Sequence, residues 1–227
     1  MTSDISTQPG QNKDQIIKSQ MEKMVDTYDS YMKKATFGRE HILRRMTVEL
    51  ASVKAGDTVL EVGCATGTLT LAAKQAAGPS GKVFGIDIIP GMIEASQRKA
   101  AQANVEITFK LGSIDSIPFP DNHFDEVMCS FMIFHMSDET RQKGIAEIQR
   151  VLKPGGRLLA LDLALPSQPF QRWIARKLLG FSADDDLRNL IPVMDASGFS
   201  DMEYGPAKFR IIGLSVIGYL RGSARKG

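Results

Sequence analysis

The sequence predicts an α/β fold with a doubly wound, mostly parallel sheet. Three observations support this prediction. An apolar strand over 57–62 runs into a turn at 63–67 that contains two glycines. A second apolar strand ends on Asp87, and strand-like and helix-like segments then alternate along most of the remaining chain. Such alternation is typical of β-α-β units, whose parallel strands have helices on both faces of the sheet.

Five short apolar segments are predicted to form the parallel strands: 57–62, 82–87, 105–110, 126–130 and 157–163. The segments between them favour helices, at 68–77, 91–103 and 138–152. The first helix is rich in alanine and ends at Gly78-Pro79. The third carries Asp138 and Glu139 in its first turn, where negative charge suits the helix dipole. Residues 153–156 are predicted to make a sharp turn into the fifth strand.

The C-terminal part is predicted to end in an antiparallel hairpin. After Asp162 the regular alternation lapses until a predicted helix over 187–196, which Gly198 ends. Two strands are then expected at 199–204 and 208–220, joined by Gly205-Pro206. A tight connection of that kind makes an antiparallel pair, which belongs at one edge of the sheet.

The domain organisation follows from length and composition. A chain of 227 residues fits one large α/β domain with a cap. Residues 1–12 are polar and predicted to be disordered, and 13–52 carry helical patterning. The α/β domain is expected over 53–227, with a cap segment at about 166–186.

Charge and cysteine content exclude several classes of protein. The net charge of +2, with no run of Lys and Arg, argues against a nucleic-acid partner. No apolar run reaches the ~18 residues of a membrane-spanning helix, and the polar N-terminus has no signal-peptide pattern. Cys64 and Cys129 make no disulfide framework, and no metal-ligand spacing is present, so we expect a cytoplasmic protein without a bound metal.

The turn after the first strand indicates a nucleoside-containing cofactor. Glycine there allows positive φ and close approach of a ligand, and the following helix presents unpaired N–H groups. Asp87, at the end of the second strand, can accept hydrogen bonds from both hydroxyls of a ribose. The spacing departs from the dinucleotide pattern G-x-G-x-x-G, and Glu61 is poorly placed for a pyrophosphate but well placed for an ammonium group. A nicotinamide-dependent reductase is therefore the weaker alternative.

The pattern from Glu61 to Gly67, followed by Asp87, resembles that of class I S-adenosylmethionine-dependent methyltransferases, with Ala65 in place of the usual middle glycine. The segments SIPFPDNHFDEV (116–127) and EIQRVLKPGGRLL (147–159) resemble the branch that includes ubiquinone/menaquinone C-methyltransferases. The resemblance covers about residues 25–165. It implies the strand order 3-2-1-4-5-7-6 with the last strand antiparallel, and an N-terminal helical lid over 13–52.

The cofactor pocket that this resemblance implies takes residues from the lid and from four strand ends. They are Tyr28, Glu61, Gly63, Cys64, Ala65, Gly67, Asp87, Ile88, Met92, Ser113, Ile114 and Ser130. In many members of the family an aspartate stands where this chain has Ser113.

The predicted activity is transfer of a methyl group from S-adenosylmethionine to a small molecule. His135, just after the fourth strand, is the candidate general base, because imidazole titrates near neutral pH. The chain lacks the Asn/Asp-Pro-Pro-aromatic motif of nucleic-acid amino-methylating enzymes. The remaining acceptors are quinols, phenols, lipids and secondary metabolites, methylated at carbon or oxygen. The alternative from another class is a protein that binds S-adenosylmethionine but performs non-methylating chemistry.

The segment 169–181 is the one indication of an apolar partner. Phe170, Trp173, Ile174, Leu178 and Phe181 fall on one helical stripe, flanked by Arg172 and Arg176. Such a helix can cover an apolar substrate, lie at a membrane surface, or simply pack on the sheet.

Overall fold

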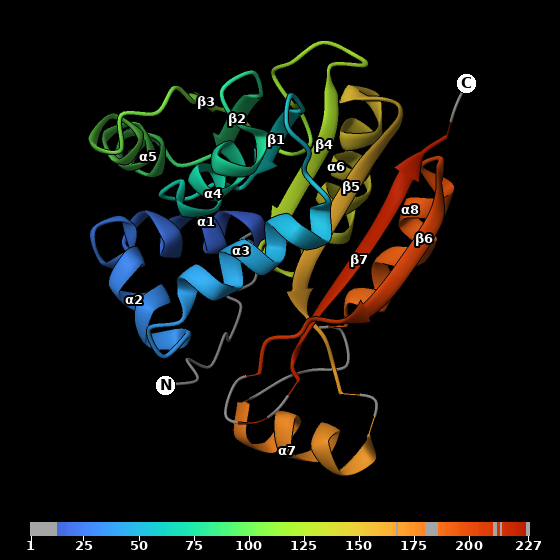
Figure 1. Cartoon of the computed structure of the whole chain (residues 1–227). Coiled ribbons are helices and arrows are strands. Elements are labelled where there is room, and N and C mark those ends of the chain that lie inside the picture. Colours follow the sequence, from blue (N-terminus) through green and yellow to red (C-terminus); the bar gives the residue numbers. More distant parts are fainter. Residues whose placement is uncertain (1–12, 167, 180–185, 211–212, 214, 226–227) are drawn as a thin grey trace.

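A seven-stranded sheet in the order β3-β2-β1-β4-β5-β7-β6 forms the centre of the molecule (Figure 1). In this computed structural model, residues 13–166, 168–179, 186–210, 213 and 215–225 are described. The strands are β1 (Thr58–Val62), β2 (Lys82–Asp87), β3 (Thr108–Leu111), β4 (Phe124–Ser130), β5 (Leu152–Leu163), β6 (Phe199–Pro206) and β7 (Ile217–Ala224). Strands β1 to β5 are parallel, and β7 runs antiparallel to both β5 and β6. The predicted strand order is confirmed.

Helices cover both faces of the sheet. The helices of the described chain are α1 (Lys13–Glu22), α2 (Tyr28–Ala35), α3 (Glu40–Ala51), α4 (Thr68–Ala77), α5 (Pro90–Gln102), α6 (Asp138–Val151), α7 (Pro169–Leu179) and α8 (Ile191–Ala196). Short 3-10 turns are η1 (Val25–Thr27), η2 (Ile133–His135) and η3 (Leu187–Leu190). The region 187–196 was predicted to form one helix. In the structure it forms the 3-10 turn η3 followed directly by the short helix α8.

The core follows the alternation of side chains along the strands. Val59 packs with α3 and α4 on one face, whereas Leu60 and Val62 pack with α6 and α8 on the other. All three are almost completely buried. Helix α3 is therefore part of the core, while α1 and α2 lie beyond it, toward the carboxyl ends of the strands (Figure 1).

The prediction that Gly205 and Pro206 form a tight turn between the last two strands is wrong. Gly205 and Pro206 are the last residues of β6, and Pro206 pairs with Gly218 of β7. Residues 207–216 form the connection, which we call the β6–β7 connection. Its apolar residues Ala207 and Phe209 are buried against Leu43 of α3 and do not extend a strand. The antiparallel pairing itself is confirmed.

Two strand boundaries also differ from the prediction. The third strand starts later than expected because Val105 and Ile107 pack against α5, and pairing with β2 begins at Thr108. The predicted turn before the fifth strand lies within β5 as an irregularity. There Phe124 pairs with Leu152 but Glu126 pairs with Arg157, so the intervening residues of β5 bulge out.

The predicted disordered tail, 1–12, and residues 167 and 180–185 of the predicted cap lie outside the described residues. The described part of the cap is helical, as α7.

Candidate cofactor site

The turn between β1 and α4 has three residues with left-handed backbone. Gly63 has φ of 70°, Ala65 of 46° and Gly67 of 77°. The backbone N–H groups of Gly63 and Cys64 donate to the carbonyl of Ile86, at 2.8 and 2.9 Å. These bonds tie the turn to the end of β2, and Ala65 occupies a backbone conformation that glycine adopts at lower cost.

The two glycines of this turn are required by different neighbours. A Cβ on Gly67 would lie 2.9 Å from Cβ of Ser96 and 3.0 Å from the ring of Phe109. A Cβ on Gly63 would lie 2.7 Å from Sδ of Met132, the flexible end of a side chain. Gly67 therefore serves the packing of α4 against α5 and β3, whereas the space beside Gly63 is bounded by an adaptable methionine.

Asp87 is held in one orientation by the backbone. One carboxylate oxygen accepts from the N–H of Ala65 at 2.9 Å, and the other accepts from the N–H of Ile89 at 3.0 Å. Burial raises the pKa of this carboxyl group, and the backbone hydrogen bonds oppose the shift. Each oxygen retains further acceptor capacity, so Asp87 is an oriented acceptor at the end of β2.

Glu61 lies on β1 and is only 2% exposed. The hydroxyl of Thr70 donates to its carboxylate. Burial raises the pKa of Glu61 to about 7, and the hydrogen bond from Thr70 and the charge of Arg44 reduce the shift. The nearby negative charge of Asp87, like burial, raises the pKa of Glu61. A buried carboxylate with this pKa favours a cation beside it.

Arg44 and Tyr28 bring a basic and a phenolic group to the same place. Arg44, on α3, is 7% exposed and forms an ion pair with Glu40 at 3.1 Å. Tyr28, on α2, has a hydrogen bond with Arg44, and burial raises the pKa of its hydroxyl. Its side chain packs with Val25 against a small cluster of Ala65, Ile89 and Met92.

A polar clasp holds α2 to the turn. Asp29 of α2 accepts from the hydroxyl of Thr66 at 2.6 Å and forms an ion pair with Lys99 of α5 at 2.9 Å. The ammonium of Lys99 also donates to the hydroxyls of Thr66 and Thr68, at 2.9 and 2.8 Å. These donors lower the pKa of Asp29 against the opposing effect of burial. We refer to Asp29, Thr66 and Lys99 as the clasp.

The structure brings most of the predicted pocket residues together. Asp87 binds the turn directly, Met92 and Tyr28 pack on Ala65, and Gly112, beside Ser113, donates to the carbonyl of Asp87 at 3.0 Å. Ile88 is 39% exposed and lies at the surface next to Asp87.

Two predicted residues direct their side chains elsewhere. Cys64 packs with Ile93 and Phe109 between α5 and the sheet, and burial raises the pKa of its thiol. Ile114 is 3% exposed and lies against Gly144 of α6, where an added Cβ would approach it to 2.7 Å.

The end of β4 supplies the remaining predicted residues. Ser130 is buried, and its hydroxyl has no hydrogen-bond partner among the described residues. His135 ends η2 and is exposed. Helix α1 secures this turn, because the ammonium of Lys13 donates to the carbonyls of Phe134 and Met136 at 2.9 and 3.1 Å.

Sequence reasoning missed Arg44, Thr70 and the clasp. Arg44 and Thr47 are polar residues within an apolar helical stripe that includes Leu43, Val48 and Ala51. A charged residue on the buried face of a helix is the signal that could have identified Arg44. The clasp has no local signal, since its members are 33 to 70 positions apart.

The charges of this site suit a cation. Glu61 and Asp87 lie at neighbouring strand ends, and each is buried and has a raised pKa. A ligand with an ammonium or sulfonium group would stabilise the ionised form of both carboxylates, whereas a pyrophosphate would place further negative charge beside them. The unpartnered hydroxyl of Ser130 offers one more contact at the same edge. The residues present therefore fit an amino-acid nucleoside.

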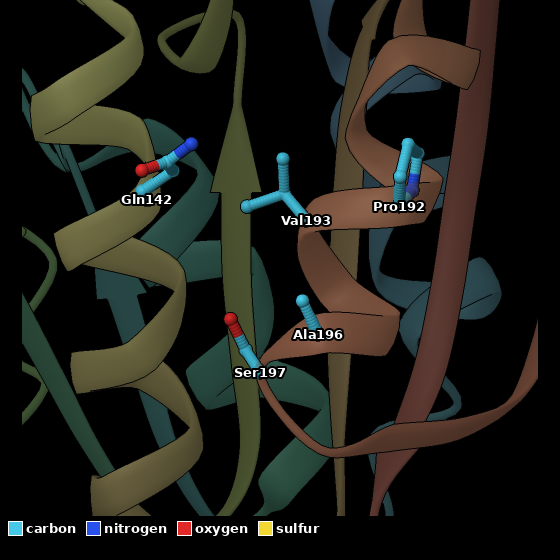
Figure 2. A pocket seen from close by; sticks show the side chains of 5 residues that line it. All are labelled: Gln142, Pro192, Val193, Ala196 and Ser197. Carbon is cyan, nitrogen blue, oxygen red and sulfur yellow. The ribbon is translucent and has the colours of Figure 1, made fainter.

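A separate hollow between α6 and α8 has a different character (Figure 2). Its lining consists of Gln142, Pro192, Val193, Ala196 and Ser197. None of these side chains is charged, and none belongs to the strand ends that hold Glu61 and Asp87.

In the described part of the chain, no cluster of His, Cys, Asp and Glu could hold a metal ion. No helix there is both long and apolar enough to cross a bilayer.

Comparison with known proteins identifies relatives for most of this structure. A family described as "Methyltransferase domain" matches residues 59–156. A demethylmenaquinone methyltransferase of Symbiobacterium thermophilum is 36% identical over 166 residues, covering 72% of this chain and 64% of that protein. A ubiquinone/menaquinone biosynthesis C-methyltransferase of Hahella chejuensis is 34% identical over 144 residues, covering 63% and 57%. The chain thus spans less than two thirds of the length of these relatives.

The fold also has solved neighbours. The structure of an S-adenosylmethionine-dependent methyltransferase from Thermotoga maritima, described as a possible histamine N-methyltransferase, aligns with a TM-score of 0.68. The alignment covers 90% of this chain and 98% of that one at 16% identity. At that identity the match concerns the fold alone.

Proposed function

Because the chain belongs to the S-adenosylmethionine-dependent methyltransferases, we propose that it transfers the methyl group of S-adenosylmethionine to a small, apolar acceptor of the quinol or phenol class. The acidic pair of Glu61 and Asp87 beside the left-handed turn is the observation that supports this most directly. The names of the quinone-methylating relatives support the acceptor class.

The chain's own residues have distinct roles in this proposal. Asp87 would accept hydrogen bonds from the ribose hydroxyls, since the backbone already orients both of its oxygens. Glu61 would bind the α-ammonium group, and Arg44 with Tyr28 would bind the α-carboxylate. Met92 and Ile88 would line the adenine, with Ser113 at its edge.

When bound, the cofactor supplies a methyl group already activated by a sulfonium. The protein then has to align the acceptor in line with that methyl, at about 3 Å, and to exclude water. Helices α1 and α2, which pack on Ala65 through Met21 and Tyr28, would provide this exclusion. His135 would take the proton that leaves the acceptor hydroxyl, so that the reaction yields S-adenosylhomocysteine and the methylated product.

Calorimetric titration with S-adenosylhomocysteine and S-adenosylmethionine tests the cofactor. We expect micromolar binding, weakened about ten- to a hundredfold by Asp87→Ala, since a hydrogen bond to a charged group contributes roughly 1.5–3 kcal/mol. Asp125→Ala is the matched control, because Asp125 also accepts a backbone N–H, from Thr58 at 2.9 Å, but at the amino ends of β1 and β4, away from the candidate site. Binding of NADH in place of these ligands would establish the reductase alternative.

A panel of quinols and phenols then tests the reaction, with mass spectrometry of both products. Fragmentation of the methylated product distinguishes carbon from oxygen methylation. Tight cofactor binding without any S-adenosylhomocysteine formed from quinols, phenols, lipids or polyketides would favour a non-methylating protein and refute the proposed transfer.

A further inference from the structure

Large apolar side chains are exposed on α7, which follows β5, and on α2 with the turn that ends it. Phe170 and Trp173 of α7 are 70% and 58% exposed, and Tyr31 and Phe37 are 55% and 61% exposed. Figure 1 shows α7 set apart from the sheet, with α2 on the same side of the molecule. We call these four side chains the aromatic rim. Exposed apolar side chains that gather on one side of a molecule are typical of interaction surfaces.

The rim is organised within the chain. The rings of Phe170 and Trp173 stack, with centroids 6.3 Å apart and an angle of 15° between planes. Phe37 has φ of 52°, a left-handed conformation that is unfavourable for a bulky residue. This conformation belongs to the C-terminal turn of α2, where the N–H groups of Phe37 and Gly38 donate to the carbonyls of Lys34 and Lys33 at 3.0 and 2.7 Å. The turn leaves the ring of Phe37 exposed.

Positive charge accompanies the rim. The segments 31–39, 169–179 and 207–216 contain eight Lys and Arg and no Asp or Glu. The rest of the chain has 20 basic and 26 acidic residues, which makes these segments the basic part of a nearly neutral protein. The exposed cations are Lys33, Lys34, Lys177, Lys208 and Arg210. Asp184 and Asp185 follow α7 in the sequence but lie outside the described residues.

Two of the three basic segments, 31–39 and 207–216, are in contact. The guanidinium of Arg39 donates to the carbonyl of Arg210 at 2.9 Å and lies 4.9 Å from the ring centroid of Phe209. The junction between α2 and α3 thus contacts the β6–β7 connection. On the other side, Arg172 of α7 donates to the carbonyl of Pro166 at 3.2 Å, close to the end of β5.

From this arrangement we propose that the chain docks on an anionic lipid bilayer, with the aromatic rim inserted at the level of the headgroups and the surrounding cations on the lipid phosphates. Aromatic rings prefer that interface, and basic residues beside them are attracted by the negative surface potential. Docking in this orientation turns the carboxyl ends of the strands toward the bilayer. The further idea that the acceptor enters from the lipid rests on the proposed function; the docking itself does not.

Trp173 makes the test direct, because it is the only tryptophan in the chain. The full chain is mixed with vesicles of phosphatidylcholine, or of phosphatidylcholine with about one third phosphatidylglycerol, the anionic lipid. With the anionic vesicles we expect sedimentation with lipid, a blue shift of Trp173 emission and quenching by lipids brominated near the headgroup. Neutral vesicles should bind at least tenfold more weakly, and added salt should release the protein.

Variants separate the two parts of the surface. Phe170→Ser should weaken binding by roughly tenfold, whereas Leu111→Ser, at a residue 57% exposed on β3, should not. The double variant Lys33→Gln, Lys34→Gln should weaken binding to the anionic vesicles by roughly fivefold for each charge removed. Lys54→Gln with Lys82→Gln, near the amino ends of the strands, is the matched control for charge.

Three results would overturn the proposal: no association with anionic vesicles at low salt, equal loss in the rim and control variants, or sedimentation without a change in Trp173 emission. The last result would place the contact elsewhere on the molecule. Titration with S-adenosylhomocysteine in the absence of lipid tests the cofactor separately, so failure of docking and failure of the proposed function are distinguishable.

Discussion

Glu61→Gln should stabilise the protein without its cofactor while impairing the cofactor site. Glu61 is almost completely buried, and its carboxylate is less stable in the folded protein than in water. Glutamine has nearly the same shape, and its amide oxygen can still accept the hydrogen bond from Thr70. The substitution therefore removes a buried charge and leaves the packing nearly intact.

The size and pH dependence of the effect follow from the pKa. Burial raises the pKa of Glu61 from 4.5 to about 7. A raised pKa in the folded state means that its contribution to stability is fully present below about pH 4.5 and is lost as the pH rises through about 7. A tenfold change in the acid dissociation constant corresponds to about 1.4 kcal/mol, so the difference between variant and wild type should grow by about 2–3 kcal/mol between pH 5 and pH 8.

Urea unfolding of both proteins at pH 5, 6, 7 and 8 measures this difference. Glu147→Gln is a suitable comparison, because Glu147 is a partly exposed acid paired with Arg150 and its pKa is lowered. That variant should lose stability at pH 8, the opposite sign. In the presence of S-adenosylhomocysteine, the wild type should gain more stability than Glu61→Gln at pH 8, because only the wild type offers a carboxylate to the ammonium group.

A constant difference between Glu61→Gln and wild type from pH 5 to pH 8 would refute this reasoning. It would mean that Glu61 keeps one protonation state over the whole range. Equal stabilisation of both proteins by the ligand would separately refute contact between Glu61 and the ammonium group.

Three further variants test other parts of the structure. Gly67→Ala should lower the free energy of unfolding by about 2–4 kcal/mol in urea titrations, whereas Gly38→Ala, also at positive φ but in open space, should lower it by about 1–2 kcal/mol; equal losses would show that packing around Gly67 is unimportant. Asp29→Asn should change global stability by less than about 1 kcal/mol, yet speed hydrogen exchange in α2. His135→Asn should lower kcat about a hundredfold or more with unchanged cofactor affinity, and an unaltered kcat would exclude it as the base.

Local sequence patterns were sufficient to predict the strand order and to bring Glu61, Gly67 and Asp87 to neighbouring strand ends. Glu61, Gly67 and Asp87 lie on consecutive strand and turn segments, so their spacing determines their relative positions. The antiparallel pairing of the last two strands was predictable for the same reason. These features depend on interactions between segments that are close in the sequence. The pattern of apolar residues is sufficient to predict such interactions.

Features that depend on distant contacts were not predictable. The tight hairpin failed because Phe209 is buried against Leu43, more than 160 residues away, and this contact draws the chain into a long connection. Arg44 reaches the site because the rest of α3 packs on the sheet. In both cases tertiary packing determines where the residue lies. The sequence shows that a residue is apolar or charged, but it does not show which distant residue it will contact.

The clasp has a consequence for how firmly α2 is held on the turn between β1 and α4. Its ammonium, from Lys99, contacts α2 through Asp29 but also the hydroxyls of Thr66 and Thr68, which belong to the turn and α4. Were α2 to separate from the turn, Lys99 would keep its two hydroxyl partners, and Asp29, already half exposed, would become hydrated. An exposed ion pair of this kind contributes little to holding α2 on the turn, and added salt would weaken it further.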